Sequence, residues 1–151
     1  VFMLRQKDEA FEAFKNFKIQ VENETRYKLK GLRTDRGGKF MSKEFMEYCN
    51  KKGIRQQLTA PYSPQQNGVV ERRNRTILGA TRSLLKAMEV PEMFWGEAVC
   101  HSVQILNRVP TKGVKNKTPY EALHWKKPTL DHFRVFGCVT HAKRPANKLS
   151  K

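Results

Sequence analysis

The pattern of apolar and polar positions predicts alternating helices and short strands in the first half of the chain. Apolar side chains spaced three and four residues apart predict a helix that begins near Asp8 as its N-cap. Its core-facing residues are expected to be Phe11, Phe14, Phe17 and Val21. This spacing indicates core packing and not a cofactor site. Residues 1–4 before it are apolar and resemble the end of a longer strand.

Two short strands with a helix between them are predicted next. Residues 28–34 predict the first strand, and residues 54–59 predict a less hydrophobic strand near the edge of a sheet. Between the strands, Ser42 is expected to cap a helix that Gly53 terminates. The predicted apolar residues of this region are Leu29, Leu32, Phe45, Met46 and Cys49.

A long basic helix is predicted after a loop that contains Pro61 and Pro64 and ends at Asn67-Gly68. At about 100° per residue, the helix from about residue 69 to 88 places its apolar side chains on one arc. That arc is expected to hold Val70, Ile77, Thr81, Leu84 and Met88. Glu71 lies at the border of this arc and heads a ridge of basic side chains. The ridge comprises Arg72, Arg75, Arg82 and Lys86.

Further elements are predicted downstream. Pro91 is expected to open a helix with buried Phe94, Ala98, Ile105 and Leu106. Trp95 in this helix fits core packing better than stacking on a base. Thr118-Pro119 predicts the start of a short helix, and residues 133–141 predict a final strand interrupted by Gly137. The last residues form a basic, polar tail.

Composition narrows the class of partner. The 151 residues fit one domain with a hydrophobic core, and their formal net charge is +16. Such an excess of positive charge predicts a polyanionic partner, because solubility alone seldom needs so much charge. Nucleic acid is favoured over a membrane surface as that partner. No apolar run approaches the roughly 20 residues of a membrane-spanning helix, and no signal peptide is expected.

The three cysteines indicate no disulfide framework. Cys49, Cys100 and Cys138 are far apart and odd in number, so they are expected to be reduced and mostly buried. Cys138 and His141 have half of a zinc-ligand spacing without a second half, and a structural interpretation is favoured for both.

Two carboxylates are the main candidates for chemistry. Asp35 ends the first predicted strand, Glu71 lies early on the basic helix, and 35 residues separate them. Carboxylate oxygens suit Mg²⁺ or Mn²⁺, which drive phosphoryl transfer on nucleic acid. Each acid also has a structural alternative. Asp35 could hold a turn, and Glu71 could favour the helix dipole and pair with Arg75.

The chain resembles the integrase core of copia-type retrotransposons, in the superfamily of retroviral integrases. Six blocks match the family pattern in order: LRTDRGGKF, GIRQQLTAPYSPQQNGVVERRNRT, MFWGEAV, LNRVPTK, KTPYEAL and FRVFGC. The resemblance implies an α/β fold like that of ribonuclease H, with a mixed sheet and helices on both faces. It also implies a core over residues 1–90, a helical and strand extension over 91–142 and a basic tail over 143–151.

The resemblance further implies a two-metal site held by two aspartates and a glutamate. By position, Asp35 and Glu71 are two of these ligands, and Arg75 is a DNA contact. Asn67 matches the loop that leads into the catalytic helix. Lys39 stands where the family usually has glutamate, and its role is open. The family's first aspartate has no counterpart, since the chain begins too late to contain it, so we expect a truncated sheet and no activity of this chain by itself.

The resemblance implies a role in DNA integration, with DNA and a homo-oligomer of integrase as partners and the nucleus, with cytoplasmic passage, as the location. Two alternatives stay open at this point. The chain could be a non-catalytic module that binds DNA or a protein partner, or a decayed element without a function.

Overall fold

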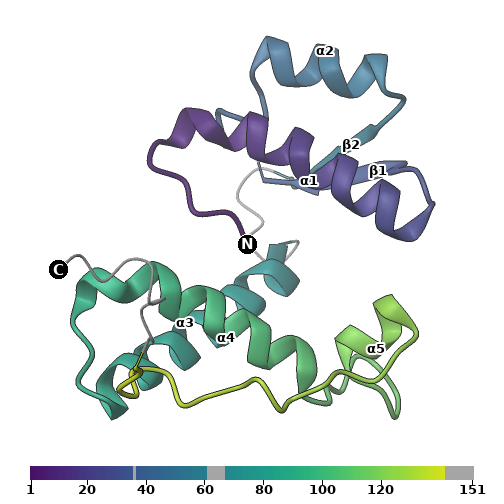
Figure 1. The fold of residues 1–151 in the computed structure, drawn as a ribbon. Coiled ribbons are helices and arrows are strands. Elements are labelled where there is room, and N and C mark those ends of the chain that lie inside the picture. Colours follow the sequence, from purple (N-terminus) through teal and green to yellow (C-terminus); the bar gives the residue numbers. More distant parts are fainter. Residues whose placement is uncertain (36, 61–66, 142–151) are drawn as a thin grey trace, which may run out of the picture. The chain divides into compact units, whose positions relative to one another are not determined.

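The structure, a computed structural model, describes residues 1–35, 37–60 and 67–141. The chain divides into two compact units, residues 1–76 and 77–151. The expected boundaries after residues 90 and 142 stay predictions, and the tail and the loop prolines Pro61 and Pro64 lie outside the described residues. The elements, labelled as in Figure 1, are η1 (Lys7–Glu9), α1 (Ala10–Thr25), β1 (Gly31–Thr34), α2 (Lys43–Lys51), β2 (Arg55–Leu58), α3 (Gly68–Ala87), η3 (Glu92–Phe94), α4 (Trp95–Arg108) and α5 (Pro119–His124).

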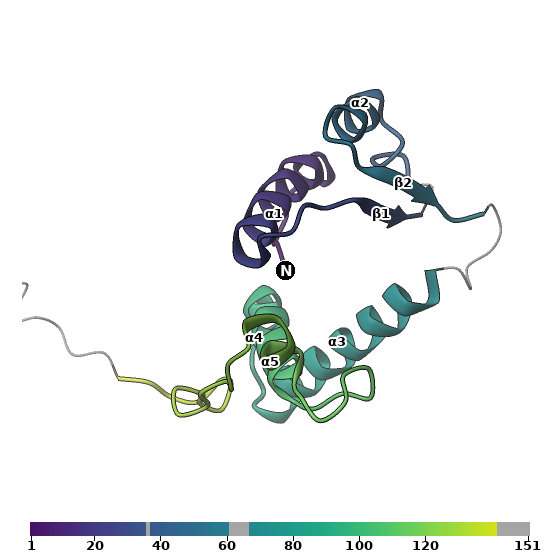
Figure 2. The same ribbon diagram turned by 90° about the vertical axis from the view of Figure 1, so that its right-hand side faces the viewer.

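The described strands form one small parallel sheet. β1 pairs with β2 so that Gly31 lies opposite Arg55 and Thr34 opposite Leu58. Parallel neighbours need a crossover connection, and α2 supplies it, lying beside β2 in Figure 2. Both predicted strands are confirmed, each shorter than expected from the sequence.

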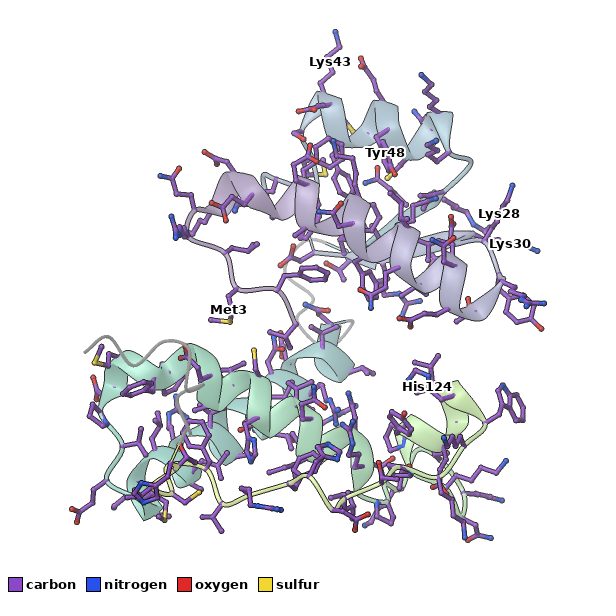
Figure 3. All side chains as sticks on the ribbon, viewed as in Figure 1. Met3, Lys28, Lys30, Lys43, Tyr48 and His124 are labelled. Atoms are coloured by element: carbon purple, nitrogen blue, oxygen red, sulfur yellow. The ribbon has the colours of Figure 1, made fainter. Side chains whose placement is uncertain are left out.

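The core of the first unit is aromatic. Phe45 and Cys49 on α2 and Ile54 at the start of β2 are buried. The ring of Phe45 lies 5.5 Å from that of Phe11 and 5.1 Å from that of Phe14, both on α1. Tyr48 also points from α2 toward α1 (Figure 3), with its ring 5.4 Å from that of Phe11. Aromatic rings in tilted and edge-on contact stabilise the packing of α1 on α2 beyond what the burial of their apolar area contributes.

The local signals around α2 are confirmed, whereas those before α1 are wrong. The Ser42 hydroxyl accepts the N–H of Phe45 at 3.2 Å, and Gly53 follows the helix with φ 67°. Asp8 does not cap α1, because it lies inside the 3₁₀ turn η1, and Glu9 takes the N-cap position without a capping side-chain bond. Phe17 is 46% exposed and therefore does not belong to the core.

The end of α1 is tied to the chain before β1. The carboxylate of Glu22 accepts a hydrogen bond from Nζ of Lys18 at 2.7 Å and another from the N–H of Leu29 at 2.8 Å. These two contacts hold the pKa of Glu22 below its usual value, the Lys18 contact contributing most. Arg26 ends the helix in the left-handed conformation.

In the second unit, the part of α3 that follows residue 76 crosses α4 (Figure 1), and the contact includes Thr81 and Ser102, both fully buried. Leu85 on α3 and Ala98 on α4 are buried beside them. The predicted arc of α3 is therefore partly wrong, since Leu85 was not in it and Met88 is 40% exposed. Val70, also expected on the buried arc, is 49% exposed. Phe94, expected to be buried in the helix after Pro91, is 43% exposed, so both expectations are wrong.

The short helix α5 is confirmed, with a complete capping box between Thr118 and Glu121. The strand predicted over residues 133–141 is wrong. The chain turns there, with the N–H of Phe133 bonded to the carbonyl of Leu130 and that of Cys138 to the carbonyl of Val135. At Phe133 and Cys138 these local bonds take the place of pairing with a neighbouring strand.

The cysteines are free thiols, as expected, but Cys100 is exposed and Cys138 only half-buried, which corrects the expected burial. Cys49 is buried, and this burial raises the pKa of its thiol. None of the described helices is both long and apolar enough to cross a membrane.

Candidate metal and nucleic-acid site

Asp35 follows the last residue of β1 and is exposed. Its Oδ1 accepts the N–H of Gly37 at 3.0 Å, so the carboxylate holds a tight turn. A Cβ at residue 37 would lie 2.9 Å from this same oxygen, so a larger residue there would displace the carboxylate. Oδ2 makes no hydrogen bond within the described residues. The turn therefore fixes the carboxylate while one oxygen stays available to a ligand.

Glu71 lies in the first turn of α3 and is exposed. The structural alternative of an i,i+4 pair with Arg75 is not realised, since the part of the chain that the structure describes shows no ion pair between them. The carboxylate still lies near the positive end of the helix dipole, where a negative charge is favourable. Its oxygens are accessible from solvent.

A cavity of about 470 Å³ lies at the end of β1 in the first unit. Its apolar wall includes Phe14 and Leu32, and its polar wall includes Asp35 and Asn67. Val70 at the start of α3 also lines the cavity, whereas Glu71 does not. The structure thus brings Asp35 and Asn67 to one cavity and places Glu71 one position beyond its wall.

The four basic residues expected to contact DNA, Arg72, Arg75, Arg82 and Lys86, are all exposed on α3. At about 100° per residue they fall within about 80° of one another around the helix axis. One side of α3 therefore carries a continuous line of positive charge, with Glu71 at its first turn. Their contact with DNA remains a prediction.

Lys39 has a structural partner that sequence analysis missed. Its ammonium group donates a hydrogen bond to the backbone carbonyl of Lys7 in η1. The contact joins residues 32 positions apart, and no local pattern around either residue signals it. Lys39 thus links the turn after Asp35 to the chain before α1.

Among the residues described, no group of three or more histidine, cysteine, aspartate or glutamate side chains could hold a metal ion. The two candidate carboxylates are therefore not accompanied by a third in the described ranges. Cys138 and His141 belong to no such group among the described residues, and their structural interpretation stays a prediction.

No protein-family model matches the chain, but retrotransposon polyproteins are similar to it over almost its whole length. It is 42% identical over all 151 residues to the retrovirus-related Pol polyprotein from transposon TNT 1-94 of Nicotiana tabacum. Over 149 residues it is 32% identical to the Pol polyprotein from transposon RE1 of Arabidopsis thaliana. The chain spans only 11% and 10% of the length of these two polyproteins.

Solved structures with a similar fold are retroviral. A chain in the structure of the simian T-cell lymphotropic virus intasome in complex with PP2A regulatory subunit B56 gamma has a TM-score of 0.61 at 21% identity, covering 92% of this chain and 45% of that chain. The catalytic core domain of HTLV-2 integrase in complex with magnesium has a TM-score of 0.56 at 24% identity, covering 78% of this chain and 72% of that one. The catalytic core domain of BIV integrase has the same TM-score at 25% identity, with 82% and 74% covered.

The expected fold is confirmed, because helices around a small parallel sheet match these integrase cores over most of the described chain. The matches to the polyproteins extend over 98% of the chain or more. The chain is therefore homologous over its whole length to a segment of retrotransposon Pol polyproteins, and it has the fold of a retroviral integrase catalytic core.

Proposed function

We propose that this chain acts in DNA integration, as part of an enzyme that joins element DNA to target DNA by metal-dependent phosphoryl transfer. The observation that carries the proposal is the placement of Asp35 at the end of β1, held by Gly37, in a chain 42% identical to a retrotransposon Pol polyprotein. The magnesium complex of the HTLV-2 core supports the same chemistry.

Asp35 and Glu71 supply the hard oxygen donors that Mg²⁺ prefers, so both fit part of a metal site. A bound Mg²⁺ would lower the barrier by stabilising charge on the attacking and leaving oxygens. The Asp35 carboxylate is prepositioned by its turn, and Glu71 is unpaired with Arg75 and accessible. Since the 151 residues carry two of the expected three carboxylates, we propose that a third must come from residues outside them.

The basic side of α3 would hold the phosphate backbone of DNA. Arg72, Arg75, Arg82 and Lys86 lie on one arc, and such contacts give affinity with little sequence preference. We expect binding to weaken steeply as salt rises, because phosphate contacts release counterions. Arg75→Gln with Arg82→Gln should reduce the salt slope by about 2, close to one unit for each arginine replaced. Affinity that stays flat between low and physiological salt would contradict this proposal.

A strand-transfer assay with Mg²⁺ or Mn²⁺ tests the catalytic part. The 151-residue chain is expected to be inactive, and a chain extended upstream to include a further aspartate is expected to be active. Asp35→Asn and Glu71→Gln in the extended chain should each abolish turnover, whereas Glu47→Gln on the exposed side of α2 should not. Turnover by the short chain that disappears with Asp35→Asn would contradict the need for a third carboxylate. Inactivity of the extended chain would contradict the catalytic role.

A homo-oligomer is the proposed assembly, supported by the intasome and the trimeric core among the structural relatives. We place this assembly in the nucleus, with cytoplasmic passage, because integration needs chromosomal DNA. Sedimentation at several protein concentrations and imaging of a tagged chain check these two points.

A further inference from the structure

The surface around α5 is strongly basic. Residues 111–127 contain five lysines and one acid, Glu121. All five lysines are exposed: Lys112, Lys115, Lys117, Lys126 and Lys127. The carboxylate of Glu121 is engaged in the capping box, where it accepts the N–H of Thr118 at 2.7 Å. The local excess of positive charge is thus presented to solvent.

An unusually exposed tryptophan lies within this basic surface. Trp125 has 85% of its area accessible, and it follows His124, which Figure 3 labels at the end of α5. Its backbone has φ 55°, and its N–H is bonded to the carbonyl of Glu121 at 3.0 Å. A bulky residue rarely adopts this left-handed conformation, so the helix cap holds the indole at the surface at some cost in strain.

One of these lysines lies close to the indole. Nζ of Lys117 is 5.3 Å from the centroid of the Trp125 ring. The hydrogen bonds from Thr118 are the main cause that holds the pKa of Glu121 below its usual value, and the positive charges of Lys127 and Lys117 act in the same direction. The high exposure of Trp125 leaves much of its ring open although Lys117 is near.

The short helix that carries this surface is anchored to α4. The guanidinium carbon of Arg108 lies 4.9 Å from the ring centroid of Tyr120. Arg108 is itself held by hydrogen bonds to the carbonyl and the side-chain amide oxygen of Gln104. Arg108 therefore holds α5 against α4, so the surface around Trp125 loses little conformational entropy when a ligand binds.

We propose that Trp125 and the surrounding lysines bind single-stranded DNA, with an unpaired base stacked on the indole and neighbouring phosphates held by Lys117, Lys126 and Lys127. An aromatic ring within a basic groove is the arrangement that holds single strands, because every base has a face that can stack. A fully paired duplex offers no free face within its length. The inference rests on the proposed function only in taking DNA as the ligand.

The full 151-residue chain and three variants test the proposal. Trp125→Asn removes the ring and keeps a residue that tolerates positive φ. Trp125→Phe keeps an aromatic ring, and Trp125→Leu keeps an apolar side chain without one. Affinity is measured for a labelled oligothymidylate and for a blunt duplex of equal length. In a Trp95→Phe background, quenching of tryptophan fluorescence reports stacking on Trp125 directly.

We expect Trp125→Asn and Trp125→Leu to weaken binding of the oligothymidylate about tenfold, with Trp125→Phe much closer to the parent. Binding of the blunt duplex should be unchanged in all three variants, and the oligothymidylate should quench Trp125. Equal losses on both DNAs, equal affinities of the phenylalanine and leucine variants, or no quenching would each overturn the proposal. Loss of self-association without loss of DNA binding would overturn it too, since the surface would then be a protein interface.

The outcomes separate this inference from the proposed function. If duplex binding through α3 is salt-dependent and substitution of Trp125 has no effect, only the proposal for Trp125 and its lysines is contradicted. If the oligothymidylate binds in a way that depends on Trp125 and the duplex does not bind at all, the single-strand site at Trp125 is supported and the proposed role of α3 is contradicted.

Discussion

The hydroxyl groups of Thr81 and Ser102 are hydrogen-bonded at 3.1 Å where α3 crosses α4, and both residues are fully buried. Thr81 also donates to the carbonyl of Ile77 at 2.8 Å. Since a hydroxyl has one proton and a carbonyl can only accept, Ser102 is the donor in the bond between the two side chains. The pair joins α3 to α4 in a place with no access to water.

Thr81→Val should lower the free energy of unfolding by about 1–3 kcal/mol, because it leaves the buried hydroxyl of Ser102 without its partner. Thr76→Val is the matched control on the same helix, since the Thr76 hydroxyl is exposed and bonded only to the carbonyl of Arg72. Urea denaturation compares the two variants. Adding Ser102→Ala to Thr81→Val should cost less than the sum of the single changes, and strict additivity would argue against this coupling.

Leu85→Ala should cost about 2–5 kcal/mol, because the side chain is buried at the helix crossing. Glu71→Gln should change the free energy of unfolding by less than about 1 kcal/mol, since this carboxylate is exposed and does not pair with Arg75. Thermal melts give the ranking. A larger effect at Glu71 than at Leu85 would show that α3 is turned differently about its axis.

The free energy of unfolding should fall as the pH drops through and below about 4.5, in part through Glu22. Its folded pKa lies below its usual value of 4.5, first because of Lys18 and then because of the N–H of Leu29. The unfolded chain therefore binds the proton more readily, so this stabilisation is present above pH 4.5 and is lost as the folded carboxyl protonates. Glu22→Gln should flatten the dependence measured by urea denaturation between about pH 5 and 3. Glu24→Gln, which removes another carboxylate from the same helix, should flatten it less.

Gly137→Ala should be destabilising, whereas Gly79→Ala should be stabilising. Gly137 has φ 83°, and a Cβ there would lie 2.5 Å from a methyl carbon of Val90 and 3.0 Å from Cβ of Met88. Left-handed strain alone costs about 1–2 kcal/mol. A Cβ at Gly79, inside α3, meets nothing within 4 Å, so alanine should gain about 0.5–1 kcal/mol. Thermal melts of the two variants should move in opposite directions, and shifts of the same sign would contradict the described turn at Gly137.

The sequence by itself determined the features that depend on a few neighbouring residues. Ser42 and Thr118 cap their helices as predicted, because a capping side chain bonds a backbone N–H only three residues away. Gly53 ends its helix for the same local reason, since its φ of 67° costs glycine little. The order of β1, α2, β2 and α3 also followed from the pattern of apolar residues, as did the resemblance to integrase cores.

Only the tertiary structure decided which of several possible faces became buried. Periodicity could not choose between Leu84 and Leu85, because the choice depends on where the small residues of α4 meet α3. Residues 133–141 have the composition of a strand, but a strand needs a partner to bond its backbone, and local turns satisfied those groups instead. The contact of Lys39 with Lys7 likewise depends on how two segments far apart in the sequence are placed, which no local pattern specifies. The same holds for the exposure of Trp125, which depends on how the elements around it pack.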